Sequence, residues 1–254
     1  MRLISWNVNG IRAVSKKGFL EWFEADAPDV LCLQETKAHP EQLVEALTHP
    51  QGYEAHFASA EKKGYSGVVT YSRQKPRAVT PGLGIDLFDS EGRTMVTDFG
   101  DFVLFNVYFP NGKARAERLN YKMAFYDSFL KIVTEVKAQG RGVVICGDVN
   151  TAHKPIDLTH PKQNEKSSGF LPKERAWIDA LIAAGFHDTL RLFTDAPEQY
   201  SWWDLRTRAR ARNVGWRIDY FFISDNLRDR ITAARIRPDI MGSDHCPIEI
   251  ELDF

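Results

Sequence analysis

The chain has 254 residues, 43% of them hydrophobic and 26% charged, and its formal net charge is −1. This composition is typical of a globular protein with a substantial core, and it excludes a protein that binds nucleic acid through overall basic charge. No apolar run approaches the roughly 18 residues that cross a membrane. The three cysteines form no CxxC pair and no signal peptide precedes the first apolar run, which favours a reducing, cytoplasmic location.

Seven short apolar runs, rich in Val, Ile, Phe and Tyr, predict strands. In chain order they are RLISWNV, VLCLQE, SGVVTYS, FVLFNVYF, GVVICGDVN, WRIDYFFI and CPIEIEL. Helical patterns separate some of them, which indicates an α/β layered domain rather than an all-β sandwich. Because no low-complexity linker interrupts the chain, we expect a single domain over residues 1–254.

Two helices can be placed from the spacing of their apolar residues. Over residues 116–138 the spacing of three or four predicts a buried face formed by Leu119, Met123, Tyr126, Leu130, Val133 and Val136. Residues 172–184 begin at Pro172 and are followed by Gly185, which are typical start and stop signals. The side of this helix that faces the core should carry Trp177, Leu181 and Ile182.

A short internal echo links the start and the middle of the chain. ISWNVNG and ICGDVNT each look like a strand that ends in two polar residues one apart. Because alternate residues of a strand point the same way, Asn7 would lie beside Asn9, and Asp148 beside Asn150. The echo suggests two half-domains that meet at a shared polar floor, although five matching residues can also arise by chance.

Polar side chains end most of the other predicted strands as well. They are Gln34 with Glu35, Tyr108 with Asn111, Asp148 with Asn150, Asp219, and Asp244 with His245. Any one of them is explained equally well as a turn residue satisfied by local hydrogen bonds. In α/β folds, however, ligands bind where strands end, so the recurrence predicts that these groups converge on one site.

The expected site is strongly acidic. Its carboxylates would be Glu35, Asp148, Asp219 and Asp244. Asp219 interrupts an apolar run and needs a partner because an unpaired buried charge is very costly, and His245 is the natural donor. The remaining carboxylates would repel one another unless a cation lay among them, and hard oxygen ligands suit Mg²⁺ or Mn²⁺. Such a pocket would activate water and stabilise charge on a phosphoryl oxygen.

Eight ordered motifs now carry a resemblance to a known family. They are WNVNG, LQETK, GYSGV, YFPN, GDVNTAH, GFLPKER, NVGWRIDYF and GSDHCP. Over residues 2–254 the chain resembles the exonuclease III family of abasic-site endonucleases, within the endonuclease/exonuclease/phosphatase superfamily. The resemblance implies a four-layer α/β sandwich of two packed mixed sheets flanked by helices. It also implies base excision repair: Mg²⁺-dependent hydrolysis 5′ to abasic sites in duplex DNA, with trimming of blocked 3′ ends.

The resemblance implies a metal site in which Glu35 is the principal carboxylate, helped by Asn7 and Asp244. Any second metal position would be lined by Asp148, Asn150 and His245. Some relatives carry Asp where this chain has Asn9. One fewer negative ligand leaves the number of bound metal ions open.

The resemblance also assigns catalytic roles. Asp148 would orient and deprotonate the attacking water, and Asn150 would help to hold it. His245, held by Asp219, would bind the scissile phosphate and stabilise the transition state. The same phosphate would be contacted by Tyr108 and Asn111.

The segment SWWDLRTRARARNVGWRID concentrates features of DNA binding. No acid occurs from Leu205 to Ile218, whereas the arginines are Arg206, Arg208, Arg210, Arg212 and Arg217. Such arginines can simply face water on a charged helix, but the flanking tryptophans favour a contact with the phosphate backbone.

By the resemblance, an abasic sugar that flips out of the duplex would enter a pocket formed by Trp202, Trp216 and Ile218. Arg206 aligns with a position from which relatives insert a side chain into the duplex. Contacts with the DNA backbone would come from Arg12, Lys62, Lys63 and Tyr65, and a further polar contact from Asn164.

Of three alternative functions, two are disfavoured and one stays open. A phosphatase or lipid phosphodiesterase would share the catalytic core, but the arginine-rich segment favours DNA. A DNA-binding protein with a relic site would have lost Glu35, Asp148 or His245, and all three are present. A broader nuclease that also nicks at uracil or damaged bases is compatible with the sequence. Nothing in the sequence demands a partner chain, so we expect a monomer.

Overall fold

Two six-stranded β-sheets pack face to face in the middle of the molecule. The computed structural model describes residues 1–254. In spatial order the first sheet contains Ile231–Ile236 (β13), Ile248–Leu252 (β14), Arg2–Asn7 (β1), Val30–Gln34 (β2), Val68–Ser72 (β4) and Glu54–Ala58 (β3). The second contains Ala78–Pro81 (β5), Thr94–Asp98 (β6), Phe102–Tyr108 (β7), Gly142–Asp148 (β8), Asp219–Ser224 (β12) and Phe186–Asp188 (β9). A separate pair joins Trp202–Trp203 (β10) to Gly215–Trp216 (β11).

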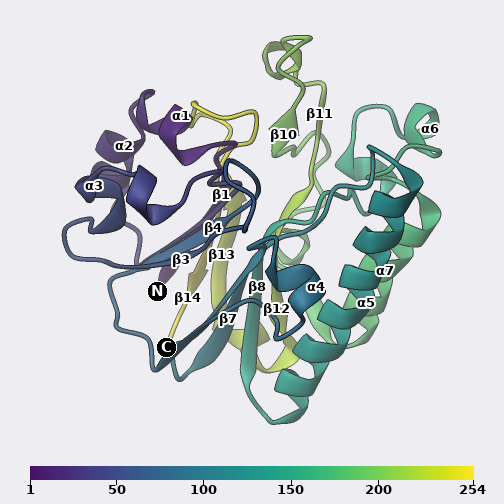
Figure 1. The fold of residues 1–254 in the computed structure, drawn as a ribbon. Helices are drawn as coiled ribbons and strands as arrows, with labels where there is room; N and C mark the ends of the chain where they lie inside the picture. Colours follow the sequence, from purple (N-terminus) through teal and green to yellow (C-terminus); the bar gives the residue numbers. More distant parts are fainter.

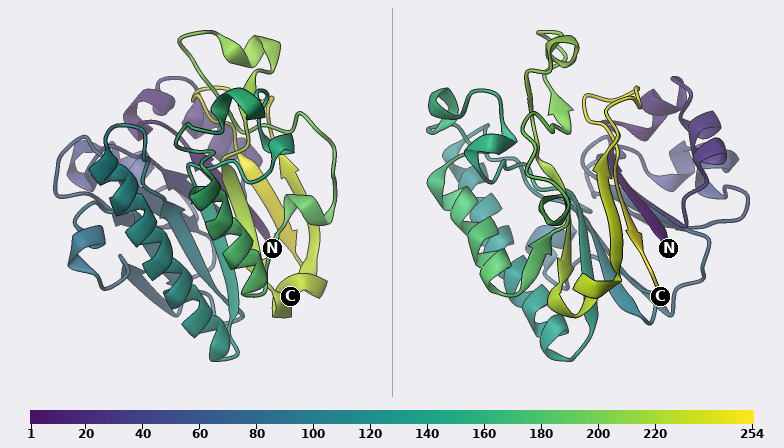
Figure 2. Two further views of the ribbon diagram at one scale, coloured as in Figure 1. Left: turned by 90° about the vertical axis from the view of Figure 1, so that its right-hand side faces the viewer. Right: turned by 180° about the vertical axis from the view of Figure 1, so that it is seen from behind.

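Helices cover the outer faces of both sheets (Figure 1, Figure 2). Their bounds are Ile11–Ser15 (α1), Phe19–Asp26 (α2), Glu45–Thr48 (α3), Asp86–Asp89 (α4), Ala116–Ala138 (α5), Pro161–Asn164 (α6) and Pro172–Ala183 (α7). Helices α1 to α3 lie outside the first sheet, and α5 and α7 lie outside the second (Figure 1). The expected four-layer α/β sandwich with two mixed sheets is therefore confirmed. No helix combines the length and the apolar character needed to span a membrane.

The seven predicted strands and the two predicted helices are all present, and the inward faces of the helices agree with the prediction in part: Tyr126, Val133, Trp177 and Leu181 are buried as expected. In α5 the buried residues are Lys122, Phe125, Tyr126, Phe129 and Val133. The predicted Leu119, Met123, Leu130 and Val136 are only partly buried. The rings of Phe125 and Phe129 pack edge-on against Phe109, so these aromatics, which the prediction left out, form much of the inward face. In α7, Ile182 is 38% exposed.

Strand direction explains why one end of the sandwich carries the polar groups. β1 is parallel to β2, and β7 is parallel to β8, so each pair ends at the same edge of its sheet. β12 runs antiparallel to β8 and therefore begins at that edge, with Asp219 opposite Asp148. Between the sheets, Gln34 Nε2 donates to Asn106 Oδ1 at 2.7 Å. This buried bond links the two sheets near the end of β2.

Candidate active site

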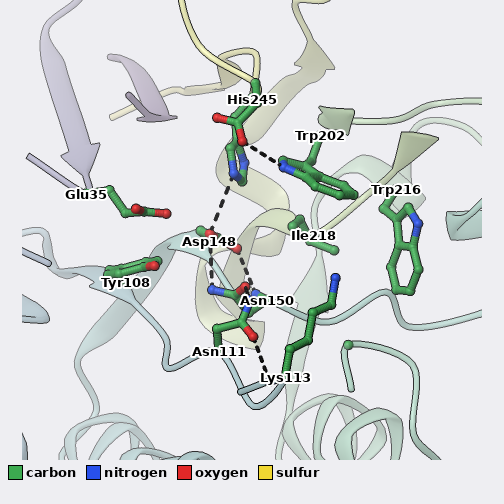
Figure 3. Close-up of a pocket in the computed structure, with 12 residues that line it drawn as sticks. Glu35, Tyr108, Asn111, Lys113, Asp148, Asn150, Trp202, Trp216, Ile218 and His245 are labelled. Carbon is green, nitrogen blue, oxygen red and sulfur yellow. Dashed lines mark hydrogen bonds and ion pairs between the residues drawn. The ribbon is translucent and has the colours of Figure 1, made fainter. Parts of the chain in front are cut away.

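One pocket of about 220 Å³ lies where β2, β7 and β8 end and β12 begins (Figure 3). Of its 12 lining residues, all except Lys113 and Gly169 were predicted from the sequence: Glu35, Tyr108, Asn111, Asp148, Asn150, Trp202, Trp216, Ile218, Asp244 and His245. The predicted convergence of strand ends is therefore observed. We call the polar part of this site, with Asn7 and Asp219 beneath it, the catalytic floor.

Asp148 is the last residue of β8 and is only 1% exposed. Its carboxylate accepts hydrogen bonds from Asn7 Nδ2 at 2.8 Å and from the Asn150 backbone N–H at 2.8 Å. The bond to Asn7 joins the two strands of the internal echo. The preceding residue must be glycine, because a Cβ on Gly147 would lie 1.9 Å from the carbonyl oxygen of Val107. Close packing of β8 on β7 thus fixes where Asp148 points.

His245 lies between two carboxylates. Its Nδ1 is 2.8 Å from Asp219 Oδ2, which also accepts a bond from Ser201 Oγ at 2.6 Å, and its Nε2 is 3.9 Å from Asp148 Oδ2. Burial alone would lower the pKa of His245, but the Asp219 carboxylate raises it to about 10. Burial raises the pKa of Asp148 to about 7; the His245 cation opposes this shift, and two nearby carboxylates add to it.

Glu35 follows β2 in a left-handed backbone conformation (φ 52°), which is costly for a residue with a Cβ and turns its side chain into the pocket. Its carboxylate accepts a bond from Asn7 Nδ2 at 2.9 Å and lies 2.8 Å from Lys37 Nζ. Burial alone would raise the pKa of Glu35, but Lys37 and Asn7 hold it below its usual value. Sequence reasoning missed Lys37, although it stands within the LQETK motif.

A metal ion fits this part of the floor. One ligand atom each from Glu35, Asp148 and His245 lie within 4.8 Å of one another. Two carboxylates and an imidazole form a donor set that suits a divalent cation. The carboxylate of Asp244 has other partners, since it accepts bonds from Asn9 Nδ2 at 2.9 Å and Trp202 Nε1 at 3.1 Å.

Amide and hydroxyl donors line the opposite side of the floor. Asn111 Nδ2 donates to Asn150 Oδ1 at 2.8 Å, and Asn150 Nδ2 donates to the carbonyl of Phe109 at 2.9 Å. Tyr108, at the end of β7, faces Glu35 (Figure 3). Burial raises the pKa of Tyr108 well above its usual value, and the Glu35 carboxylate adds to the shift. Tyr108 therefore remains a hydrogen-bond donor at neutral pH.

An apolar wall closes the other side of the pocket. The rings of Trp202 and Trp216 meet edge to face with centroids 6.5 Å apart, and Ile218 is buried behind them. The ammonium of Lys113 lies 5.3 Å from the Trp202 ring and 5.4 Å from the Trp216 ring. Lys113 was not predicted because nothing in its local sequence distinguishes it from a solvated loop lysine.

Exposed basic residues on other segments form what we call the basic rim. It comprises Arg12 on α1, Lys62 and Lys63 before β4, and Arg206 between β10 and β11. These segments and α6 surround the upper end of the sandwich (Figure 1). Asn164, the last residue of α6, lines a second cavity of about 530 Å³. The hydroxyl of Tyr65 is turned inward, where it accepts a bond from Arg93 Nη2 at 2.8 Å.

Two arginines of the arginine-rich segment are structural, which corrects the interpretation of all five as DNA-binding. Arg217 is 1% exposed and forms a bidentate pair with Asp188 and a bond to Asp157 Oδ1 at 2.8 Å. Arg210 donates to three backbone carbonyls, those of Pro238, Ile240 and Ser243. Because these partners are distant in the sequence, composition alone could not reveal them.

Comparisons with known proteins agree with this geometry. The model of the Endonuclease/Exonuclease/phosphatase family matches residues 4–245. The chain is 42% identical to the exodeoxyribonuclease of Bacillus subtilis over an alignment of 256 residues, which covers 100% of both chains. It is 41% identical to the DNA repair nuclease APEX1 of Danio rerio, covering 99% of this chain and 82% of that protein. The structure of an AP endonuclease from Archaeoglobus fulgidus superposes with a TM-score of 0.90 at 28% identity, covering 100% of both chains. The chain therefore belongs to the endonuclease/exonuclease/phosphatase family, in its exonuclease III branch.

Proposed function

We propose that this protein hydrolyses the phosphodiester 5′ to abasic sites in duplex DNA and also trims blocked 3′ ends. The observation that carries this proposal is one pocket in which a buried Asp148–His245–Asp219 chain faces an apolar wall of tryptophans. The floor offers groups that activate water and bind a phosphate, and the wall offers space for a sugar without its base. The names of the Bacillus and Danio relatives support the same assignment.

Each residue of the floor would have a separate role in the reaction. Asp148 would accept the proton of the attacking water, which Asn150 helps to hold. His245, kept cationic by Asp219, would donate to the phosphate through Nε2 as negative charge develops. Two further donors to this phosphate would be Tyr108 and Asn111.

The proposed cofactor is Mg²⁺, or Mn²⁺, with Glu35 as its principal carboxylate ligand and with Asn7 and Asp244 helping to hold it. When bound, such an ion supplies Lewis acidity to a phosphoryl oxygen and neutralises the carboxylates. Burial is the main cause of the raised pKa of Asp148, and the carboxylates of Asp219 and Glu35 add to the shift, which a bound cation would oppose.

The basic rim would hold the duplex, and Trp202, Trp216 and Ile218 would receive the extruded sugar. The ammonium of Lys113, over both tryptophans, would then contact the flipped nucleotide. We infer that residues 1–254 act as one catalytic domain and as a monomer, since both sheets of a single chain contribute to the one pocket.

A labelled duplex with one stable abasic-site analogue tests the proposal, beside an undamaged duplex, with Mg²⁺ and with EDTA. We expect metal-dependent cleavage immediately 5′ to the analogue, and an Asp148→Asn variant serves as the inactive control. Shortening of the undamaged duplex from its 3′ ends measures the accompanying exonuclease activity, and a uracil duplex tests broader damage recognition. Cleavage of a simple phosphomonoester without cleavage of either duplex would contradict the assignment to DNA and favour a phosphatase.

A further inference from the structure

Arg93 is a buried cation beside the catalytic floor, and the mechanism above gives it no role. It lies directly before β6 and is only 2% exposed. Backbone and side chain both connect it to Tyr108: the Tyr108 N–H donates to the Arg93 carbonyl at 2.8 Å, and Arg93 Nη1 donates to the Tyr108 carbonyl at 3.0 Å. The last residue of β7 is thus fixed at both of its backbone polar groups.

The guanidinium of Arg93 also lies over the Tyr108 ring. Its central carbon is 4.7 Å from the centroid of that ring and 5.6 Å from the centroid of the Tyr65 ring. A planar cation on the face of an aromatic ring is attracted by the ring quadrupole and restricts how the ring can tilt. It also draws electron density from the ring, which makes the phenolic O–H of Tyr108 a stronger hydrogen-bond donor.

Three neighbours hold Arg93 in this place. Its Nε is 2.5 Å from Glu91 Oε2, and its Nη2 donates to the Tyr65 hydroxyl at 2.8 Å. Arg118 closes the cluster through bonds to Glu91 Oε1 at 2.7 Å and to the Tyr65 hydroxyl at 3.1 Å. With a hydrogen bond from each of its three nitrogens and with its side chain buried, Arg93 is not available to bind DNA directly.

We propose that Arg93 is a positioning residue that acts through the hydroxyl of Tyr108. It fixes the backbone and ring of Tyr108 so that the O–H meets a non-bridging oxygen of the phosphodiester as negative charge develops there. The inference rests on the proposed function, in which Tyr108 contacts the scissile phosphate. The group that accepts the hydrogen bond from Tyr108 is a phosphodiester of DNA, and this hydrogen bond should strengthen in the transition state.

A double-mutant cycle tests the inference with Arg93→Met, Tyr108→Phe and the combined variant on the abasic duplex. In the otherwise native enzyme, Arg93→Met should lower kcat about tenfold and leave KM within about twofold, because only a transition-state contact is weakened. In the Tyr108→Phe background, the same change should cost less than about twofold, because the hydroxyl through which Arg93 acts is gone. Arg93→Lys, which keeps the positive charge opposite Glu91, should restore part of kcat.

Arg118→Met is the matched control, since Arg118 contacts Glu91 and Tyr65 but makes no hydrogen bond to Tyr108. It should reduce thermal stability as the Arg93 variant does, while kcat stays within about twofold of the native value. Equal losses from Arg93→Met with and without the Tyr108 hydroxyl would overturn the inference and leave the nuclease assignment intact. Absence of incision by the native enzyme would overturn both. If the methionine variant does not fold, the cycle with Arg93→Lys decides between these outcomes.

Discussion

The catalytic floor and the basic rim are built differently. Floor residues such as Asp148, Asp219 and His245 are buried, and their polar atoms are bonded to other residues of the protein. Rim residues such as Arg12 and Arg206 are exposed and have few protein partners. The fold itself therefore fixes the geometry of the floor, whereas it leaves the charged side chains of the rim largely free in solvent.

This difference predicts two kinds of mutational effect. A change in the floor alters groups that are already oriented for the transition state, so it should lower kcat. A change in the rim removes a screened, solvent-exposed charge, so it should weaken binding and alter its salt dependence. The following substitutions test the contrast in order of expected effect.

Asp148→Asn should have the largest effect. The amide keeps the shape of the side chain but cannot accept the proton of water, so kcat should fall about 10³-fold or more. Binding of the abasic duplex in EDTA should stay close to that of the native protein, because the rim is untouched. Single-turnover kinetics and a fluorescence-anisotropy titration measure the two quantities. Substantial residual turnover would remove Asp148 as the group that activates water.

Asp219→Asn should lower kcat about 10²-fold, because His245 loses the carboxylate that keeps it cationic and oriented. NMR titration in EDTA should show the pKa of His245 falling from about 10. A histidine whose folded-state pKa is raised from 6.5 to about 10 stabilises the protein fully below pH 6.5, and this contribution is lost as the pH rises through 10. The difference in unfolding free energy between native protein and variant should therefore shrink over that range, and a constant difference would contradict the assigned ion pair.

Glu35→Ala should weaken binding of the metal ion rather than impair proton transfer from the attacking water. Loss of one of the three grouped ligands should raise the Mg²⁺ concentration needed for half-maximal activity about tenfold or more. Saturating metal should recover much of kcat. Lys37→Met is the comparison variant, because it removes the ion pair with Glu35 but no ligand, and it should not raise the metal requirement. An unchanged requirement in Glu35→Ala would eliminate this residue as a ligand.

The same contrast explains what could be predicted from the sequence. The ends of apolar strands mark the floor, so the convergence of Glu35, Asp148 and His245 follows from periodicity and from the rule that ligands bind at strand ends. Lys113 and Arg93 lie over aromatic rings that belong to other elements, and no local pattern marks them. Their contributions depend on tertiary packing, which periodicity does not describe.

The arginine-rich segment shows most clearly where prediction from sequence composition fails. The segment from 205 to 218 contains arginines of two kinds, and only the fold separates them. Arg217 finds its partners Asp157 and Asp188 at sequence separations of 60 and 29 residues. A buried guanidinium between two aspartates is a structural group, since removal of one partner leaves an uncompensated buried charge. Charge density in a sequence therefore overestimates the number of residues available to DNA.

Arg206 and Arg210 provide the finest test, a rim arginine against a structural one, because they are four residues apart and of one type. Arg206→Met should weaken DNA binding only a few-fold and should reduce the slope of log Kd against log salt by about 1, as expected for the loss of one phosphate contact. Arg210→Met should leave that slope unchanged and should lower the melting temperature, because its guanidinium bonds the carbonyls of Pro238, Ile240 and Ser243. Salt titrations and thermal unfolding of both variants measure these quantities side by side. If the slope changed equally in both, the separation of this segment into a structural and a DNA-binding arginine would be wrong.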